Sequence, residues 1–223
     1  MENVKISPSI LAADLTCLKD EIARAVEGGC DDIHIDIMDA HFVPNLSFGP
    51  RMVETVRTFT DLPLDVHLMM DNPRDMIGAF ADAGSSFITV HVEVLDDVPG
   101  TLAAISDLGI RPGLSLKPDT PVDMVIPYLS LVDILLVMSV FPGFGGQDFI
   151  EESYGRIREV SRAANLLPSP PLISVDGGIG FENAPLIVKA GANHLVAGTT
   201  IFREHHAEEN IRHLREVLTR IRG

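Results

Sequence analysis

Short apolar runs alternate with amphipathic stretches from one end of this chain to the other, and this alternation restricts the fold more than any other feature. Each apolar run has the length and near-continuous hydrophobicity of a buried parallel strand, and each amphipathic stretch has the period of a helix. The predicted strands cover residues 4–11, 32–37, 64–69, 87–92, 111–116, 134–137, 172–175 and 195–197. The predicted helices cover residues 15–27, 51–59, 73–82, 99–108, 150–165, 183–190 and 207–222, with a weaker helical stretch at 122–128.

Eight strand and helix units in 223 residues favour a closed barrel. Strand–helix alternation predicts a parallel sheet, and a sheet that closes on itself leaves no exposed edge. The competing fold, an open doubly wound sheet, usually has a glycine-rich turn after its first strand, whereas residues 12–15 read Ala-Ala-Asp-Leu. No linker, low-complexity tract or charge block divides the chain. The sequence therefore predicts a single-domain (β/α)8 TIM barrel, of α/β class, over residues 1–223.

The charge balance restricts the possible partners. The chain has 32 acidic side chains against 17 Lys and Arg, and its formal net charge of −15 is opposite to the basic footprint that nucleic acid requires. No apolar run approaches the ~20 residues that span a bilayer, and the first residues lack the pattern of a secretory signal. We therefore expect a cytoplasmic protein that binds neither nucleic acid nor membranes. Cys17 and Cys30 are expected to be buried thiols, with a disulfide between them as the alternative.

Histidine and aspartate alternate with isoleucine in the run Ile-His-Ile-Asp-Ile-Met-Asp at 33–39. Successive side chains of a strand point to opposite faces, so His34, Asp36 and Met38 share one face. A carboxylate buried there without a partner would be very costly. Two solutions remain open for this segment: a bound divalent cation, or a buried hydrogen bond between His34 and Asp36 without a metal.

Two further residues with metal-ligand side chains end other predicted strands. His67 lies in the third strand and Asp176 follows the seventh. Functional residues of a barrel lie at the carboxyl ends of its strands, so we expect His34, Asp36, His67 and Asp176 to converge there. Two imidazoles with two carboxylates suit zinc, ferrous iron, manganese or cobalt better than calcium. In the alternative interpretation, His67 packs against a backbone carbonyl and Asp176 caps a turn.

Glycine-rich loops follow the last three predicted strands. Glycine permits close approach and unusual dihedral angles, and bare backbone N–H groups bind anions without a lysine or arginine. Barrels often hold phosphate at the loops after strands seven and eight. These loops therefore predict a phosphate site, which comprises Gly143, Phe144, Gly145, Gly146, Gly177, Gly178, Gly198 and Thr199.

Met38, Met69 and Met138 fall at the ends of strands beside the expected metal. Filling a core is the usual role of methionine. A wall of thioethers would also exclude water from a reacting centre, which makes these side chains candidates for the wall of an active site.

The remaining histidines have lesser expected roles. His91 ends the fourth predicted strand and is a candidate for contact with the metal ligands from behind. The segment 41–50, which includes His41, is expected to be a mobile lid or a subunit contact. Surface positions near the last helix are expected for His205, His206 and His213.

With these residues assembled, the chain resembles the ribulose-phosphate 3-epimerase family. The resemblance extends over nearly the whole length. It is carried by the segments SPSILAAD at 7–14, HIDIMD at 34–39, HFVPN at 41–45, DVHLM at 65–69, PGFGGQ at 142–147 and VDGG at 175–178.

The resemblance implies a barrel that binds one divalent metal ion per subunit through His34, Asp36, His67 and Asp176. It also implies that Ser9 and His67 contact a sugar-phosphate substrate, and that the glycine-rich loops hold the phosphate. The family further implies a homo-oligomer, either a dimer or a hexamer.

The implied reaction interconverts D-ribulose 5-phosphate and D-xylulose 5-phosphate. Asp36 and Asp176 are the candidate catalytic pair. One carboxylate removes the C3 proton, a 2,3-enediolate forms, and the other carboxylate returns a proton to the opposite face. The metal stabilises the developing charge.

Two other activities are alternatives. Ala40, Phe141 and the Thr-Thr pair at 199–200 depart from the family pattern, and the similar allulose-6-phosphate 3-epimerases act on a six-carbon substrate. Gly145 favours the pentose enzyme, because those relatives more often have alanine there. The second alternative is a phosphate-binding barrel aldolase or decarboxylase such as hexulose-6-phosphate synthase. The sequence pattern of those enzymes has Asp-x-Lys at the end of a strand, and this chain does not resemble it, because residues 34–36 read His-Ile-Asp.

Overall fold

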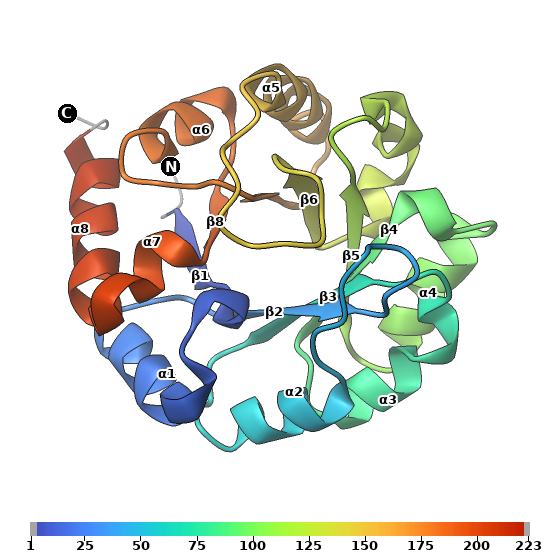
Figure 1. Cartoon of the computed structure of the whole chain (residues 1–223). Helices are drawn as coiled ribbons and strands as arrows, with labels where there is room; N and C mark the ends of the chain where they lie inside the picture. Colours follow the sequence, from blue (N-terminus) through green and yellow to red (C-terminus); the bar gives the residue numbers. More distant parts are fainter. Residues whose placement is uncertain (1–3, 221–223) are drawn as a thin grey trace.

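Eight parallel strands form one sheet that curves into a ring, and helices surround it (Figure 1). The computed structural model describes residues 4–220. The strands are β1 Lys5–Pro8, β2 Ile33–Met38, β3 Leu64–Met69, β4 Phe87–His91, β5 Arg111–Leu116, β6 Ile134–Met138, β7 Leu172–Asp176 and β8 His194–Ala197. The helices are α1 Leu18–Glu27, α2 Pro50–Arg57, α3 Ile77–Asp82, α4 Val98–Asp107, α5 Ser153–Ala164, α6 Ala184–Ala190, α7 Thr199–Phe202 and α8 Ala207–Thr219.

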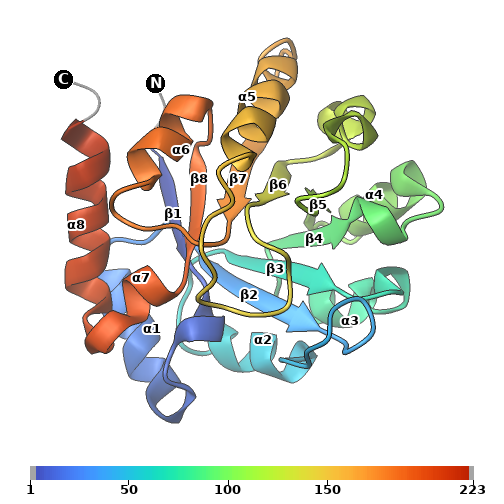
Figure 2. The ribbon, with the colours of Figure 1, turned by 45° about the horizontal axis from the view of Figure 1, so that its top comes forward.

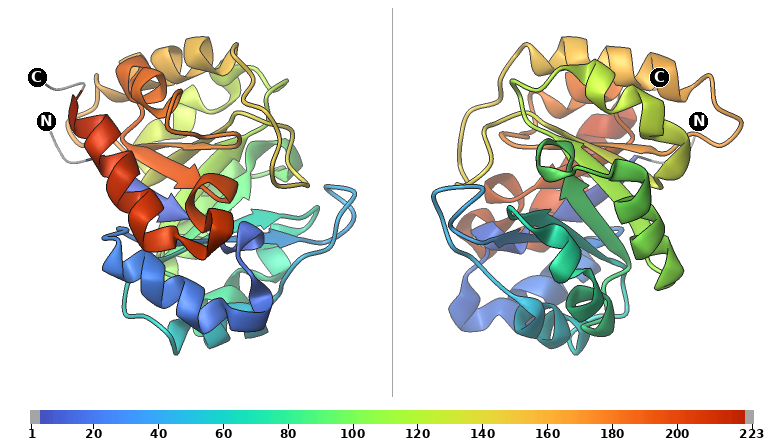
Figure 3. Two further views of the ribbon diagram at one scale, coloured as in Figure 1. Left: turned by 60° about the vertical axis from the view of Figure 1, so that its left-hand side comes forward. Right: turned by 90° about the vertical axis from the view of Figure 1, so that its right-hand side faces the viewer.

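The strand order β1-β8-β7-β6-β5-β4-β3-β2 follows the chain around the ring. The ring closes between β1 and β2 through one parallel bridge, which pairs Ser9 with His34. Outside the strands, α8 packs beside α1 and joins the end of the described chain to its start (Figure 3). The predicted TIM barrel is confirmed.

Most of the predicted elements are confirmed, with differences at their ends. β1 is shorter than the predicted strand 4–11, because residues Ile10–Ala12 turn into a 3-10 helix that buries Ile10 in the core. The weak helical stretch at 122–128 forms two 3-10 helices, because Pro127 has no N–H group to continue an α-helix. The predicted helix 207–222 ends at Thr219, and its residues 221 and 222 lie outside the described residues.

Alternation along each strand separates two environments. In β2 the side chains of Ile33, Ile35 and Ile37 point outward and belong to the main apolar core between strands and helices. His34 and Asp36 point into the barrel, and both are at least 95% buried. The inside of this barrel is therefore partly polar, and its polar groups need partners within the protein.

A chain of polar contacts satisfies some of these groups beneath the carboxyl ends of the strands. Nε2 of His194 lies 3.0 Å from Oδ2 of Asp32, and its Nδ1 lies 2.7 Å from Oγ of Ser174. All three side chains are buried. Removing one partner of a buried ionic pair leaves the other without compensation.

Replacing Asp32 by asparagine tests this contact. We expect Asp32→Asn to lower the free energy of unfolding by about 3 kcal/mol, because the buried His194 loses its charged partner. Urea denaturation at pH 6 measures the change. Asp123 lies exposed in a 3-10 helix, and the matched Asp123→Asn control is expected to change stability by less than about 0.5 kcal/mol. Equal stability of the two variants would contradict the role of the pair.

The same pair predicts a pH dependence. Burial would lower the pKa of His194, but Asp32 raises it above its usual range. Burial would raise the pKa of Asp32, but His194 lowers it below its usual range. The raised pKa of His194 contributes to the free energy of unfolding fully below the unfolded pKa of about 6.5, and this contribution is lost as the pH rises through the folded pKa. The lowered pKa of Asp32 also stabilises the folded state, and its contribution is lost as the pH falls through the folded pKa of Asp32. The stability difference between wild type and Asp32→Asn is therefore expected to be largest near about pH 5 and to shrink above neutrality.

The two cysteines are free thiols, so the alternative of a disulfide between them is wrong. Cys30 is buried as predicted, whereas Cys17 is only partly buried. Among the helices within residues 4–220, none combines the length and apolar character needed to cross a membrane.

Candidate active site

A cavity of about 230 Å³ opens at the carboxyl ends of the strands. The loops after β2 and β6 extend beyond these strand ends (Figure 2). Most of the predicted site residues line this one cavity, although they come from distant parts of the sequence. They are Ser9, Asp36, Met38, Met69, Met138, Gly143, Phe144, Gly145, Gly146, Asp176, Gly177, Gly178, Gly198 and Thr199.

Asp36 is the centre of a buried hydrogen-bond network. Its Oδ2 accepts a hydrogen bond of 2.7 Å from Oγ of Ser9. Its Oδ1 lies 3.2 Å from Nε2 of His34 and 3.1 Å from Nδ1 of His67. Asp36 is only 4% exposed, yet it borders the cavity. The carboxylate is therefore held in one orientation while it stays accessible from the cavity.

Further side chains hold the two imidazoles from behind. Nδ1 of His34 lies 2.7 Å from Oδ2 of Asp65, and Nε2 of His67 lies 2.9 Å from Nε2 of His91. Nδ1 of His91 lies 3.1 Å from Oε2 of Glu93. Such contacts fix the orientation of an imidazole and decide which ring nitrogen carries a proton.

Asp36 and Asp176 have opposite pKa shifts. Burial would raise the pKa of Asp36, but His34 and His67 reverse this effect and hold it well below its usual range. Burial raises the pKa of Asp176 to about 7, and the charge of Asp36 contributes in the same direction. The negative charge on Asp36 therefore disfavours ionisation of Asp176 in the same cavity.

The four predicted metal ligands come together. One ligand atom from each of His34, Asp36, His67 and Asp176 lies within 4.8 Å of the others. Two carboxylates that compete for negative charge would gain from a cation between them, and imidazole nitrogens with carboxylate oxygens are donors for first-row transition metals. The residues therefore fit a divalent cation, and they form a possible metal site.

The glycine-rich loops form the other side of the cavity. No lysine or arginine of the described residues lines the cavity. The described N–H groups of Gly178 and Gly198 donate no hydrogen bond to a protein acceptor. Neutral N–H donors and the hydroxyl of Thr199 are thus groups that this wall offers to an anion, whereas the hydroxyl of Thr200 already donates a hydrogen bond to the carbonyl oxygen of Ile179.

Gly178 is required for the shape of this wall. Its φ is 63°, in the left-handed region that favours glycine. A Cβ at this position would collide with the backbone of Gln147 and Phe149 in the loop after β6. Gly178 therefore holds two of the glycine-rich loops close together.

The loop after β2 contacts the loop after β6. Nδ2 of Asn45 donates a hydrogen bond of 2.7 Å to the carbonyl oxygen of Gly143. Ala40, in the same loop, has φ 62°, in the left-handed region that residues other than glycine rarely adopt. The predicted alternatives for segment 41–50, a mobile lid or a subunit contact, stay predictions.

Three predicted positions differ in detail. His34 is the second residue of β2 and does not end the strand, although its ring still reaches the site. His67 is fully buried and does not line the cavity, so its contact with substrate stays a prediction. His205 is on the surface as expected, but it also approaches Glu21 of α1.

Sequence reasoning missed Asp65 and Glu93. Asp65 lies two residues before His67, so the period of the strand places both on the inner face of the barrel. That signal was available in the sequence. Glu93 follows β4 in a 3-10 helix, where no strand period applies.

The fold and the site define a (β/α)8 barrel enzyme with its cavity at the carboxyl ends of the strands. The family model described as "Ribulose-phosphate 3 epimerase family" matches residues 5–202. Curated proteins named ribulose-phosphate 3-epimerase match at 45% identity in Bacillus subtilis, over 95% of this chain and 98% of that protein, and at 38% in Aquifex aeolicus, over 96% of each. The chain belongs to the ribulose-phosphate 3-epimerase family, and it is an isomerase of the epimerase class.

Solved structures support the fold independently. The crystal structure of KGPDC from Streptococcus mutans has a TM-score of 0.73 at 15% identity and covers 100% of both chains. The 3-hexulose-6-phosphate synthase from Salmonella typhimurium has a TM-score of 0.70 at 14% identity, over 97% of this chain and 99% of that one. At such identities these likenesses concern the barrel alone.

The role of Gly178 can be tested by substitution. We expect Gly178→Ala to raise KM for ribulose 5-phosphate about tenfold, because the added Cβ displaces backbone N–H donors from the substrate. A tenfold change corresponds to a loss of about 1.4 kcal/mol of binding free energy. Steady-state kinetics measure the change. Gly155 lies exposed in α5 with free space where an alanine Cβ would lie, so Gly155→Ala is the matched control. Unchanged KM in Gly178→Ala would contradict the role assigned to these loops.

Proposed function

We propose that this protein interconverts D-ribulose 5-phosphate and D-xylulose 5-phosphate by proton exchange at C3. The observation that carries the proposal is the placement of Asp36 and Asp176, from β2 and β7, on the wall of one cavity. Membership of the family supports the same reaction. We further propose that the protein acts as a homo-oligomer, a dimer or a hexamer, in the cytoplasm.

The two carboxylates divide the proton transfers. Asp36, whose pKa is lowered, is the ionised group that removes the C3 proton of one epimer. Asp176, whose pKa is raised to about 7 by burial and by Asp36 when no cation is bound, is in this proposal the group that returns a proton to the opposite face of C3. A pair of carboxyls with separated pKa values provides a base and an acid in one site. In the reverse direction the two residues exchange these roles.

Other residues position the substrate and the catalytic groups. Ser9 donates a hydrogen bond to Asp36 and borders the cavity, so it orients the carboxylate next to the substrate. Met38, Met69 and Met138 form an apolar wall that excludes water from the enediolate. Backbone donors of Gly178 and Gly198 bind the phosphate in this proposal, with the glycines after β6 on the same wall.

One divalent metal ion per subunit completes the proposed site. His34, Asp36, His67 and Asp176 would hold it, and zinc, ferrous iron, manganese and cobalt fit their nitrogen and oxygen donors. When bound, such an ion supplies positive charge that stabilises the negative charge developing on the substrate oxygens.

The substrate and the metal are tested together. Purified protein is treated with a chelator, dialysed, and assayed for epimerisation of ribulose 5-phosphate and allulose 6-phosphate after addition of iron, zinc, manganese or cobalt. We expect activity to be lost with the metal and restored by at least one of these ions. We also expect kcat/KM for the pentose to exceed that for the hexose by at least about tenfold, which corresponds to 1.4 kcal/mol.

Each result has a separate meaning. A preference for allulose 6-phosphate would move the chain to the hexose-phosphate epimerases and leave the mechanism unchanged. Full activity in the chelated protein, with no residual metal by elemental analysis, would contradict the metal site. Absence of epimerisation of either sugar would contradict the proposed function.

The catalytic pair is tested by Asp36→Asn and Asp176→Asn. Each variant is expected to lower kcat by about 10²–10⁴-fold or more, because positioned acid–base groups contribute factors of this size. In D2O, the wild-type product is expected to contain solvent deuterium at C3. Mass spectrometry of the product measures this incorporation.

Controls separate chemistry from folding. The exposed Asp123→Asn variant is expected to keep wild-type kcat. Circular dichroism checks that both active-site variants remain folded. An Asp36→Asn enzyme with near wild-type kcat would overturn the assignment of this carboxylate.

A further inference from the structure

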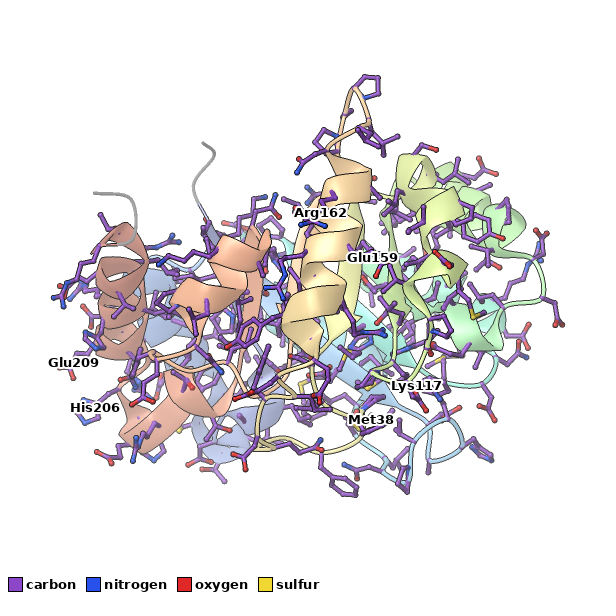
Figure 4. The ribbon with its side chains drawn as sticks, turned by 90° about the horizontal axis from the view of Figure 1, so that it is seen from above. Met38, Lys117, Glu159, Arg162, His206 and Glu209 are labelled. Atoms are coloured by element: carbon purple, nitrogen blue, oxygen red, sulfur yellow. The ribbon has the colours of Figure 1, made fainter. Side chains whose placement is uncertain are left out.

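A second group of metal-ligand side chains lies outside the cavity. It is found where the connection between β1 and α1 meets the turn after α7 (Figure 3, left). One ligand atom from each of Asp14, Cys17 and His205 lies within 4.8 Å of the others. Neither this cluster nor Glu21 beside it contributes to the wall of the active-site cavity. His206, next to His205 in the chain, lies at the periphery in Figure 4, far from Met38 of the cavity.

Glu21 provides a second and independent observation. Its side chain is fully buried, with 0% exposure, and its Oε1 faces Cys17 and His205 of the cluster. Oε1 lies 3.9 Å from Sγ of Cys17, 2.5 Å from Nδ1 of His205 and 2.7 Å from Nη2 of Arg24. Oε2 is buried and has no hydrogen-bond partner among the described residues. A buried carboxylate oxygen without a partner is costly, and a cation is one way to compensate for it.

The remaining donors are also available. Oδ1 of Asp14 accepts hydrogen bonds from the backbone N–H and the hydroxyl of Thr16, whereas Oδ2 accepts none from residues 4–220. Cys17 is a free and partly buried thiol at the start of α1. The exposed side of His205 leaves the cluster open to solvent, from which an ion can enter.

We propose that Asp14, Cys17, Glu21 and His205 form a second metal site, which binds zinc or another borderline-soft divalent ion. One thiolate, one imidazole and carboxylates are zinc donors, whereas magnesium and calcium prefer oxygen donors alone. Ligand atoms of a tetrahedral zinc site lie about 3.3–3.8 Å apart. The ligand atoms of Asp14, Cys17 and His205 lie within 4.8 Å of one another, and Oε1 of Glu21 lies 2.5 Å from Nδ1 of His205, so the exposed His205 side chain must move away from Glu21 to reach this spacing.

The bound ion would cross-link two distant segments. Asp14, Cys17 and Glu21 belong to the first strand–helix connection and α1, and His205 is 184 residues further along the chain than Glu21. Glu204 and His205 both have positive φ, with values of 55° and 59°, so the turn after α7 adopts a conformation that few residues favour. An ion that binds His205 stabilises this turn, which follows the phosphate loop at Gly198 and Thr199.

Cys17 permits a test that separates this site from the active site. The four proposed active-site ligands include no sulfur. A cobalt(II) titration of the metal-free protein is therefore followed by the near-ultraviolet absorption that arises only from thiolate bound to cobalt. We expect this absorption in the wild type and in Cys30→Ser, and we expect Cys17→Ser to lack it. Equilibrium dialysis with zinc is expected to give two ions per wild-type chain and one per Cys17→Ser chain.

Two more variants test the other ligands. His205→Asn and Asp14→Asn are expected to weaken cobalt binding, followed by the thiolate absorption, at least about tenfold. Epimerase activity of the Cys17→Ser protein, supplied with one metal ion, is expected to stay at the wild-type level. A wild-type protein without thiolate absorption would overturn the proposal. So would absorption that persists in Cys17→Ser, or cobalt affinity that neither His205→Asn nor Asp14→Asn changes.

Discussion

The parallel register of β2 and β3 places Asp36 opposite His67 and His34 opposite Asp65, and the candidate site depends on this pairing. A shift of β2 by one residue would turn His34 and Asp36 outward, into the apolar layer between strands and helices, and would separate them from Asp65 and His67. The isoleucines of β2 pack in that layer and thereby fix the register. The same burial that stabilises the barrel therefore orients the polar groups that it encloses.

The phosphate side of the cavity solves a different problem. A protein with a net charge of −15 repels an anionic substrate at long range. The described part of its cavity wall has no lysine or arginine to counter that repulsion, and it offers N–H groups and the hydroxyl of Thr199 instead. Because these donors are neutral and fixed by the backbone, they act over short distances and select for shape as well as charge.

Much of this arrangement is readable from the sequence, and the reasons differ from residue to residue. The period of two in β2 predicts that His34 and Asp36 share a face, and barrel closure predicts that they meet His67 and Asp176. His67 is buried away from the cavity wall because it packs against His91. This contact between two strands cannot be predicted from the sequence pattern of either strand alone. The approach of His205 to Glu21 is also invisible in the sequence, because it depends on a turn with two residues of positive φ.

The bridge between Ser9 and His34 has a consequence for how the molecule loses function. The barrel closes there through one backbone pairing, while neighbouring strands elsewhere share at least three paired positions. Ser9 also donates a hydrogen bond to Asp36, so the strand pairing with the fewest paired residues lies next to the proposed catalytic carboxylate. Under mild denaturing conditions, opening of this pairing would inactivate the protein while most of its sheet stays intact. Inactivation and global unfolding would then be two separate events, with different midpoints.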